Sequence, residues 1–221
     1  MKQTPAIGDL LLIMARLRSP TGCPWDREQD HFSLRFHAVE EVYELIDAIE
    51  ARDDAEMIEE LGDLLLQVVF HCQLAQERGA FDFDKVCRRV ADKLVRRHPH
   101  VFGDAKARTV DAVWAQWEKI KKAEKDGTRH ERPSAMDGIP RHLPALMRAE
   151  KLVKKARKAK LVADTERPSS PRSKAELAKA LFELAASAQK RGWSAEALLR
   201  SEAQKQERAL RRLERQQNGT T

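Results

Sequence analysis

The chain has 221 residues, of which 42% are hydrophobic and 34% are charged, and its formal net charge at pH 7 is +6. This composition excludes an intrinsically disordered protein, because the apolar residues are numerous and recur with a regular period. No apolar run approaches the roughly 20 residues that a membrane-spanning helix needs, so no association with a membrane is expected.

The first part of the chain has the periodicity of successive helices, and no stretch alternates between apolar and polar residues as a strand does. The segment that contains Cys23, Pro24, Trp25 and Asp26 is expected to form a loop, as is the stretch HPHVFGD after residue 97. Gly79 is expected to end the third helix, and Thr109 is a candidate N-cap of the fifth. The helices predicted in this part cover about residues 7–18, 33–51, 55–78, 84–97 and 110–125.

A segment rich in glycine and proline follows, and its composition predicts a linker at residues 126–142. Three further helices are predicted at about residues 143–160, 173–191 and 194–216, with Ser173 and Glu176 as a capping box. We therefore expect an all-α protein that buries its apolar stripes in a helical bundle. The expected organisation is a catalytic domain at residues 1–125, the linker, and a second helical region at residues 143–221.

Charge is distributed unevenly along the chain. Residues 1–140 have a net charge of −5, whereas residues 141–221 have a net charge of +11. A basic region of this kind attracts the phosphates of nucleic acids. It has no interleaved aromatic residues and no recognisable nucleic-acid motif, so a solvated surface is the favoured interpretation and nucleic-acid binding the alternative.

The three cysteines indicate the compartment of the protein. Cys23, Cys72 and Cys87 are odd in number and lack the spacing of a metal site, which predicts reduced thiols. The N-terminal apolar run is too short for a signal peptide and has no small-residue cleavage site. We therefore expect a cytoplasmic protein.

Carboxylates occur inside two predicted helices that otherwise carry apolar residues. Apolar residues occupy most of the circumference of the helix at 55–78, which predicts a helix buried nearly all round. In the helix at 33–51, Glu41 and Glu44 lie at or beside the edge of the apolar face. One polar seam interrupts the apolar surface of the helix at 55–78, and it consists of Glu56, Glu60, Asp63, Gln67 and His71.

Like charges three residues apart on a helix repel one another, and buried carboxylates need a paired charge or a metal. Two carboxylate pairs on facing helices form an oxygen-rich site that suits Mg²⁺ or Mn²⁺. The sequence therefore predicts a metal site formed by Glu41, Glu44, Glu60 and Asp63. The alternative is that both pairs are solvated faces of surface helices.

A magnesium site in a helical bundle is suited to holding phosphates, which need cationic side chains nearby. Lys93 and Arg97 lie one helical turn apart, and Arg96 is adjacent to them. Trp117 and Lys121 have the same spacing and are candidates to hold a base and further phosphate charge. Taken alone, basic residues on a helix are usually solvated, and a tryptophan such as Trp117 is more often a core residue than a platform for a base.

Six motifs in order resemble the MazG family of nucleoside triphosphate pyrophosphohydrolases. The resemblance is strong over residues 8–122 and recognisable to about residue 155. The motifs are CPWD at 23–26, EEVYE at 40–44, ELGDLLLQVVFH at 60–71, GAFDFDKV at 79–86, DKLVRRHPHVFGD at 92–104 and WEKIK at 117–121.

This resemblance implies a four-helix core that is usually dimeric and that hydrolyses NTPs and dNTPs to the monophosphate and pyrophosphate with Mg²⁺. A role in cleaning the nucleotide pool is expected, and a narrower pyrophosphohydrolase of the dCTP/dUTP or alarmone type is the alternative. The resemblance makes Glu41, Glu44, Glu60 and Asp63 the metal ligands and places Glu40 beside them as a spare carboxylate. It assigns Lys93 and Arg97, with Arg96 adjacent, to phosphate binding and has Trp117 and Lys121 complete the nucleotide site.

The second helical region resembles a degenerate copy of the first. The sequence from Glu176 aligns with the sequence from Glu60, and Lys179 stands where the first copy has Asp63. The short loop at residues 164–172 replaces the segment that would correspond to EEVYE. We therefore expect the second copy to bind no catalytic metal and any activity to lie in the first.

Overall fold

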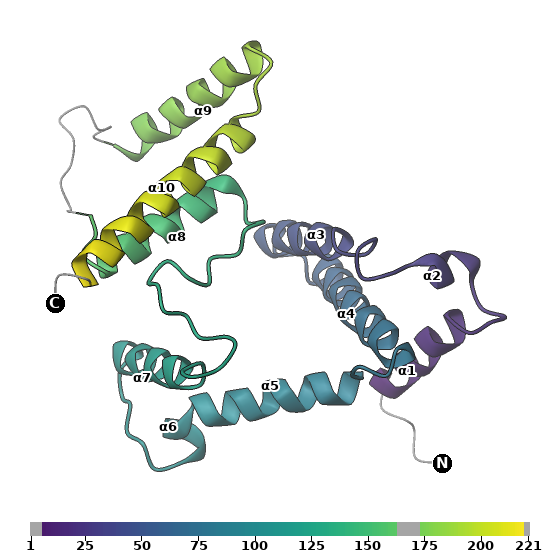
Figure 1. Ribbon diagram of the computed structural model, residues 1–221. Coiled ribbons are helices and arrows are strands. Elements are labelled where there is room, and N and C mark those ends of the chain that lie inside the picture. The colour runs from purple at the N-terminus through teal and green to yellow at the C-terminus, as the bar shows by residue number, and fades with distance from the viewer. Residues whose placement is uncertain (1–5, 163–172, 219–221) are drawn as a thin grey trace. The chain divides into compact units, whose positions relative to one another are not determined.

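The computed structural model describes residues 6–162 and 173–218, and within these ranges the only regular elements are helices (Figure 1). This confirms the predicted all-α class. The chain divides into two compact units, Met1–Glu118 and Lys119–Thr221, which are described separately below. The predicted loop at residues 164–172 lies outside the described residues.

The first unit contains the helices that carry the predicted site. The helices α3 and α4 pack along each other, and α4 also contacts α1 and α5. The helices of this part of the chain are α1 Ala6–Leu17, α2 Pro24–Glu28, α3 His37–Ala51, α4 Asp54–Glu77, α5 Phe83–Arg97, α6 Pro99–Phe102 and α7 Val110–Ala123. The boundary between the two units falls within α7.

Two predicted loops contain short helices, which corrects the sequence interpretation. Both α2 and α6 begin with a proline, which is favoured at the first helical position because its ring fixes φ and its missing N–H is not needed there. The second predicted helix also begins later than expected, at His37 rather than at residue 33. Residues 30–33 instead form a turn, in which the Asp30 carboxylate accepts hydrogen bonds from the backbone N–H groups of Phe32 and Ser33.

A tight turn joins α3 and α4 into a helical hairpin. Arg52 ends α3 in the left-handed conformation with φ of 56°, and Asp53 caps α4 by accepting hydrogen bonds from the N–H groups of Ala55 and Glu56. The turn brings the two acidic helices face to face. The core of the unit lies against the second half of α4 and consists of Met14, Leu34, Val69, Phe70 and Leu74.

The expectation that the helix at 55–78 is buried nearly all round is wrong for a single chain. Near the start of α4, Ile58 is 73% exposed and Leu61 is 49% exposed. The facing helix leaves Val42 and Ile46 exposed as well. The periodicity of a sequence identifies apolar positions but not the partner that covers them, and here one chain does not supply that partner.

The second unit is built around α8 (Ala145–Lys158) and α10 (Ala195–Asn218), which pack on each other, while α9 (Lys174–Lys190) contacts α10. Its core includes Met136, Leu152 and Leu210, so part of the segment predicted as a linker packs inside this unit. The hydroxyl of Ser173 accepts a hydrogen bond from the N–H of Glu176 at 3.1 Å and thereby caps α9. Among the described residues, no helix is both long and apolar enough to cross a membrane.

Candidate functional site

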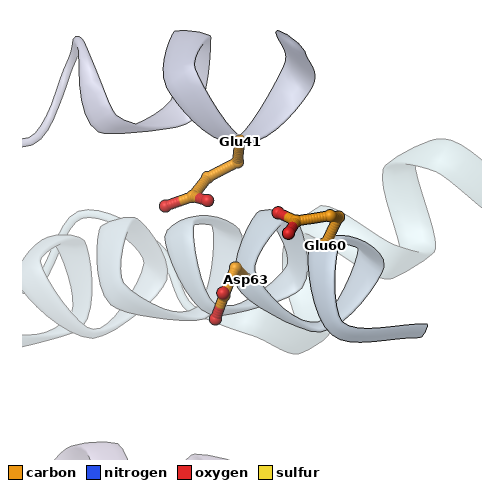
Figure 2. Close-up of side chains that lie close together, drawn as sticks. All are labelled: Glu41, Glu60 and Asp63. Carbon is orange, nitrogen blue, oxygen red and sulfur yellow. The ribbon is translucent and has the colours of Figure 1, made fainter. Parts of the chain in front are cut away.

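Three of the four predicted metal ligands meet between α3 and α4. Glu41 projects from α3 toward α4, on which Glu60 and Asp63 lie three residues apart (Figure 2). One carboxylate oxygen of each residue lies within 4.8 Å of the other two. The hairpin turn therefore produces an acidic cluster from residues far apart in sequence, and we keep the name acidic cluster for Glu41, Glu60 and Asp63.

The cluster concentrates negative charge in a half-buried position. Burial raises the pKa of Glu41, and the negative charges of Asp63 and Glu44 raise it further. Burial likewise raises the pKa of Glu60, with Glu44, Asp63, Glu41 and Glu56 as additional causes. Glu41 and Glu60 are therefore harder to ionise in the folded chain than in water, and a bound cation would reverse this effect.

The cluster also contains an orphaned acceptor. The Oε2 atom of Glu60 is inaccessible to solvent and has no hydrogen-bond partner. Such an oxygen is costly unless a cation or a proton satisfies it. Hard divalent cations such as Mg²⁺ prefer oxygen ligands, and carboxylates above all, so the residues present fit a divalent metal ion.

The fourth predicted ligand, Glu44, lies beside the acidic cluster rather than in it. Its side chain is exposed, but it is close enough to raise the pKa of both Glu41 and Glu60. Glu40 is also exposed and lies 3.8 Å from the Nδ1 atom of His37, outside the cluster. Glu44 thus lies at the edge of the acidic cluster, and Glu40 lies outside it.

An open groove of about 400 Å³ extends from Glu60 toward the turn between α3 and α4. Sequence reasoning missed Asp47 and Asp53 as parts of this acidic surface. The spacing of three residues from Glu44 to Asp47 was the available signal, because it continues the spacing from Glu41 to Glu44. The groove is lined by Glu44, Asp47, Ala48, Ala51, Asp53, Glu56 and Glu60.

The polar seam of α4 continues beyond the cluster. Gln67 is buried, and its Nε2 atom donates a long hydrogen bond of 3.4 Å to Oε1 of Glu41. One turn further on, Nδ1 of His71 lies 2.8 Å from Nδ1 of His31. Sequence reasoning did not identify His31, which follows α2 and carries no periodic signal of its own.

The predicted phosphate and base residues form a second group at the end of α5. The guanidinium carbon of Arg97 lies 5.0 Å from the centroid of the Trp117 ring, and the ring of His98 contacts Trp117 edge-on. Lys93 is half-buried one turn before Arg97, and Arg96 is exposed. Lys121 belongs to the second unit. We keep the name Trp117 group for Arg97, His98 and Trp117.

Within one chain, the described packing does not join the Trp117 group to the acidic cluster. Phe83 at the start of α5 packs against the core of the first unit, whereas Arg97 lies fourteen residues further along, about 21 Å at 1.5 Å per residue. The cluster of metal-ligand atoms contains no residue of α5. The first unit therefore carries an anionic group and a cationic group on different helices.

Known proteins resemble the chain over the same region. The model of the MazG nucleotide pyrophosphohydrolase domain matches residues 29–102, which contain α3, α4 and α5. A nucleoside triphosphate pyrophosphohydrolase of Escherichia coli K12 is 51% identical over 150 residues, which are 67% of this chain and 56% of the relative. A nucleoside triphosphate pyrophosphohydrolase/pyrophosphatase MazG of Thermotoga maritima is 48% identical over 148 residues, 67% of this chain and 55% of the relative.

The chain thus spans little more than half the length of these two relatives. An uncharacterised 26.1 kDa protein of Streptomyces cacaoi matches over a larger share, with 41% identity over 208 residues. That alignment covers 93% of this chain and 81% of the relative. The similarity to this relative therefore extends into the second, basic unit.

Proposed function

Because the chain belongs to the MazG nucleotide pyrophosphohydrolase family, we propose that it hydrolyses nucleoside triphosphates to the monophosphate and pyrophosphate. The acidic cluster is the observation that carries this proposal, since Glu41, Glu60 and Asp63 converge from two helices around an orphaned carboxylate oxygen. Three carboxylates without a cationic partner in the cluster destabilise the fold, so a ligand-binding role accounts for them better than a structural one.

The acidic cluster would hold a divalent cation, for which Mg²⁺ is the proposed identity and Mn²⁺ the alternative. Glu44 would supply a fourth carboxylate from its position beside the cluster. When bound, such an ion draws electron density from the phosphorus under attack and neutralises charge on the leaving pyrophosphate.

In the proposed reaction, water attacks the α-phosphorus and the bond from that phosphorus to its bridging oxygen breaks. Pyrophosphate leaves with the electron pair, and a carboxylate outside the cluster accepts the proton of the attacking water. Glu40 is the carboxylate that the family resemblance suggests.

Lys93 and Arg97, with Arg96 adjacent, would neutralise the phosphoryl oxygens, and a guanidinium is suited to this because it presents several donors in one plane. In one chain these residues lie on a helix that carries no member of the acidic cluster. Lys121 would contribute further positive charge as the family resemblance implies.

We infer further that the active form is a homodimer in which a second copy covers the exposed face of the α3–α4 hairpin. The apolar residues left exposed on this face are Val39, Val42, Ile46, Ile58, Leu61 and Leu65. Burying such a face stabilises a complex by about 25 cal/mol for each Å² of apolar surface removed from water. A dimer is also what the family resemblance implies.

The second unit is proposed to be non-catalytic. Within residues 6–162 and 173–218, the acidic cluster is the one group of three or more carboxylate, imidazole or thiol ligands close enough to hold a metal. In the second unit, Lys179 pairs with Glu183 at 3.8 Å on the exposed surface of α9. Nucleic-acid binding is an alternative role of this region, and its positive charge is the observation that supports it.

Pyrophosphate release from a panel of triphosphates tests the proposed function. The panel contains the canonical NTPs and dNTPs and their deaminated forms, each with and without Mg²⁺. We expect release that requires the metal and that is lost in Glu41→Gln, while Glu59→Gln, an exposed neighbour on α4, retains it. Turnover of dCTP or dUTP alone would instead support the narrower specificity, and metal-independent turnover would refute the metal site.

A further inference from the structure

The Arg97 guanidinium lies over the ring of Trp117. The guanidinium carbon of Arg97 lies 5.0 Å from the ring centroid, which is within the distance of a cation–π contact. Arg97 ends α5 and Trp117 lies on α7, so this contact joins two helices through one charged group. An arginine stacked on an aromatic ring has fewer rotamers available than one that projects freely into water.

His98 holds the tryptophan from a second direction. Its Nδ1 atom donates a hydrogen bond to the carbonyl of Leu94 at 2.7 Å, which fixes the orientation of the imidazole. The ring then meets Trp117 at an interplanar angle of 69°, with the centroids 5.0 Å apart. This edge-on geometry is a preferred arrangement of aromatic pairs. Two consecutive residues, Arg97 and His98, therefore contact the same indole.

Two roles for Trp117 make different predictions about what a substrate touches. As a platform for the base, the indole would stack against the nucleobase and leave the phosphates to other residues. As a support for Arg97, it would act on every ligand that carries the same phosphate chain, whether or not a base is attached. The contact between the indole and the guanidinium is the geometry that the second role requires.

We propose that Trp117 is a positioning residue that orients the Arg97 guanidinium for the triphosphate, and that His98 holds Trp117 in place. This inference rests on the proposed function, in which Arg97 binds phosphate. It replaces the expected role of Trp117 as a base-holding residue and makes the discrimination between bases independent of this indole.

The test compares a ligand with a base and a ligand without one. Binding of inorganic tripolyphosphate and of a non-hydrolysable dATP analogue, each with Mg²⁺, is measured by calorimetry for the full chain and its variants. We expect Trp117→Leu to weaken both ligands by the same factor of about three to ten. We expect Trp117→Phe, which keeps an aromatic face, to restore most of the affinity, and His98→Gln to produce a smaller loss for both ligands.

A double-mutant cycle separates positioning from an independent contact. In the Arg97→Gln background, Trp117→Leu should add no further loss, because the group that the indole orients is already absent. Trp114→Leu is the matched control on the same helix, since Trp114 is 61% exposed and should leave both affinities unchanged. Circular dichroism of each variant establishes that α5 and α7 remain folded.

Three results would overturn the inference. They are a loss confined to the dATP analogue, a full additional loss in the Arg97→Gln background, and a parent chain that does not bind tripolyphosphate. Pyrophosphate release is measured on the same samples. Equal and non-additive losses of binding without any turnover by the parent would support the positioning role and refute the proposed hydrolysis.

Discussion

The Nδ1 atoms of His31 and His71 lie 2.8 Å apart, in rings whose planes are inclined by only 14°. At this distance one nitrogen must donate and the other accept, so the pair holds one proton between the two atoms. The hydrogen bond ties the turn before α3 to the polar seam of α4. The contact joins residues 40 positions apart, and it lies two turns beyond Asp63 on α4.

This pair predicts a dependence of stability on pH. Burial, and then the charge of His31, lower the pKa of His71 below its ordinary value of 6.5. Below pH 6.5 the unfolded chain therefore binds a proton that the folded chain resists. The free energy of unfolding should be fully retained above about pH 7 and should fall as the pH drops through 6.5, by at most about 1.4 kcal/mol per pH unit for this group.

Urea unfolding measured between pH 5 and pH 8 checks this expectation. His71→Gln should remove most of this slope, whereas replacement of the exposed His130 by glutamine should leave it unchanged. Equal slopes in the parent and in His71→Gln would show that the histidine pair is not the cause.

Removal of one charge from the acidic cluster should lower the rate of pyrophosphate release without lowering the melting temperature. In Asp63→Asn the shape of the side chain is kept and one repelling charge is lost, so the melting temperature should stay the same or rise. Loss of a metal ligand should lower pyrophosphate release by about a hundredfold or more. Glu59→Gln removes a charge from the exposed side of the same helix and should leave both quantities near the parent values. A parent-like rate in Asp63→Asn would contradict the assignment.

The ion pair between Arg18, which directly follows α1, and Glu77 of α4 should stabilise the fold more than an exposed pair of the same chemistry. Arg18 donates two hydrogen bonds of 2.7 Å to the Glu77 carboxylate, and only 9% of the Arg18 side chain is exposed. Its Nη1 atom also donates to the carbonyl oxygen of Asp26, which ties α2 to α1. Arg18→Ala should therefore lower the free energy of unfolding by about 2–3 kcal/mol.

Arg88 supplies the control for this prediction. It pairs with Asp84 at 2.7 Å on the open surface of α5, and Arg88→Ala should leave the free energy of unfolding near that of the parent, because water screens an exposed pair. Chemical denaturation of the two variants compares the two losses. Equal losses would mean that burial does not decide the strength of these pairs.

A charge on the exposed face of the hairpin should disrupt the proposed dimer. Leu61 is half-exposed in one chain, and Leu61→Asp would place a carboxylate inside the interface without disturbing the core of the first unit. Sedimentation equilibrium should show a dimer for the parent and a monomer for the variant. Val110→Asp, an equally drastic change at an exposed position of α7, should remain dimeric. A monomeric parent would rule out the dimer.

Much of the local structure follows from the sequence because its causes are local. The helical period and the capping side chain of Ser173 both act within one or two turns. The two acidic pairs were recognisable for the same reason, since spacings of three residues place side chains on one face of a helix. Pro24 and Pro99 were read as loop residues although each begins a short helix.

The sequence by itself determined that the protein is all-helical and that Glu41 and Glu44, like Glu60 and Asp63, lie three residues apart on one helix. Only the tertiary structure decided that Glu41 meets Glu60 and Asp63, that Glu44 lies beside them, and that Arg97 rests on Trp117. The reason is that helix periodicity fixes the direction of each side chain about its own axis, whereas contact between helices depends on the turns and core packing that set one axis against another.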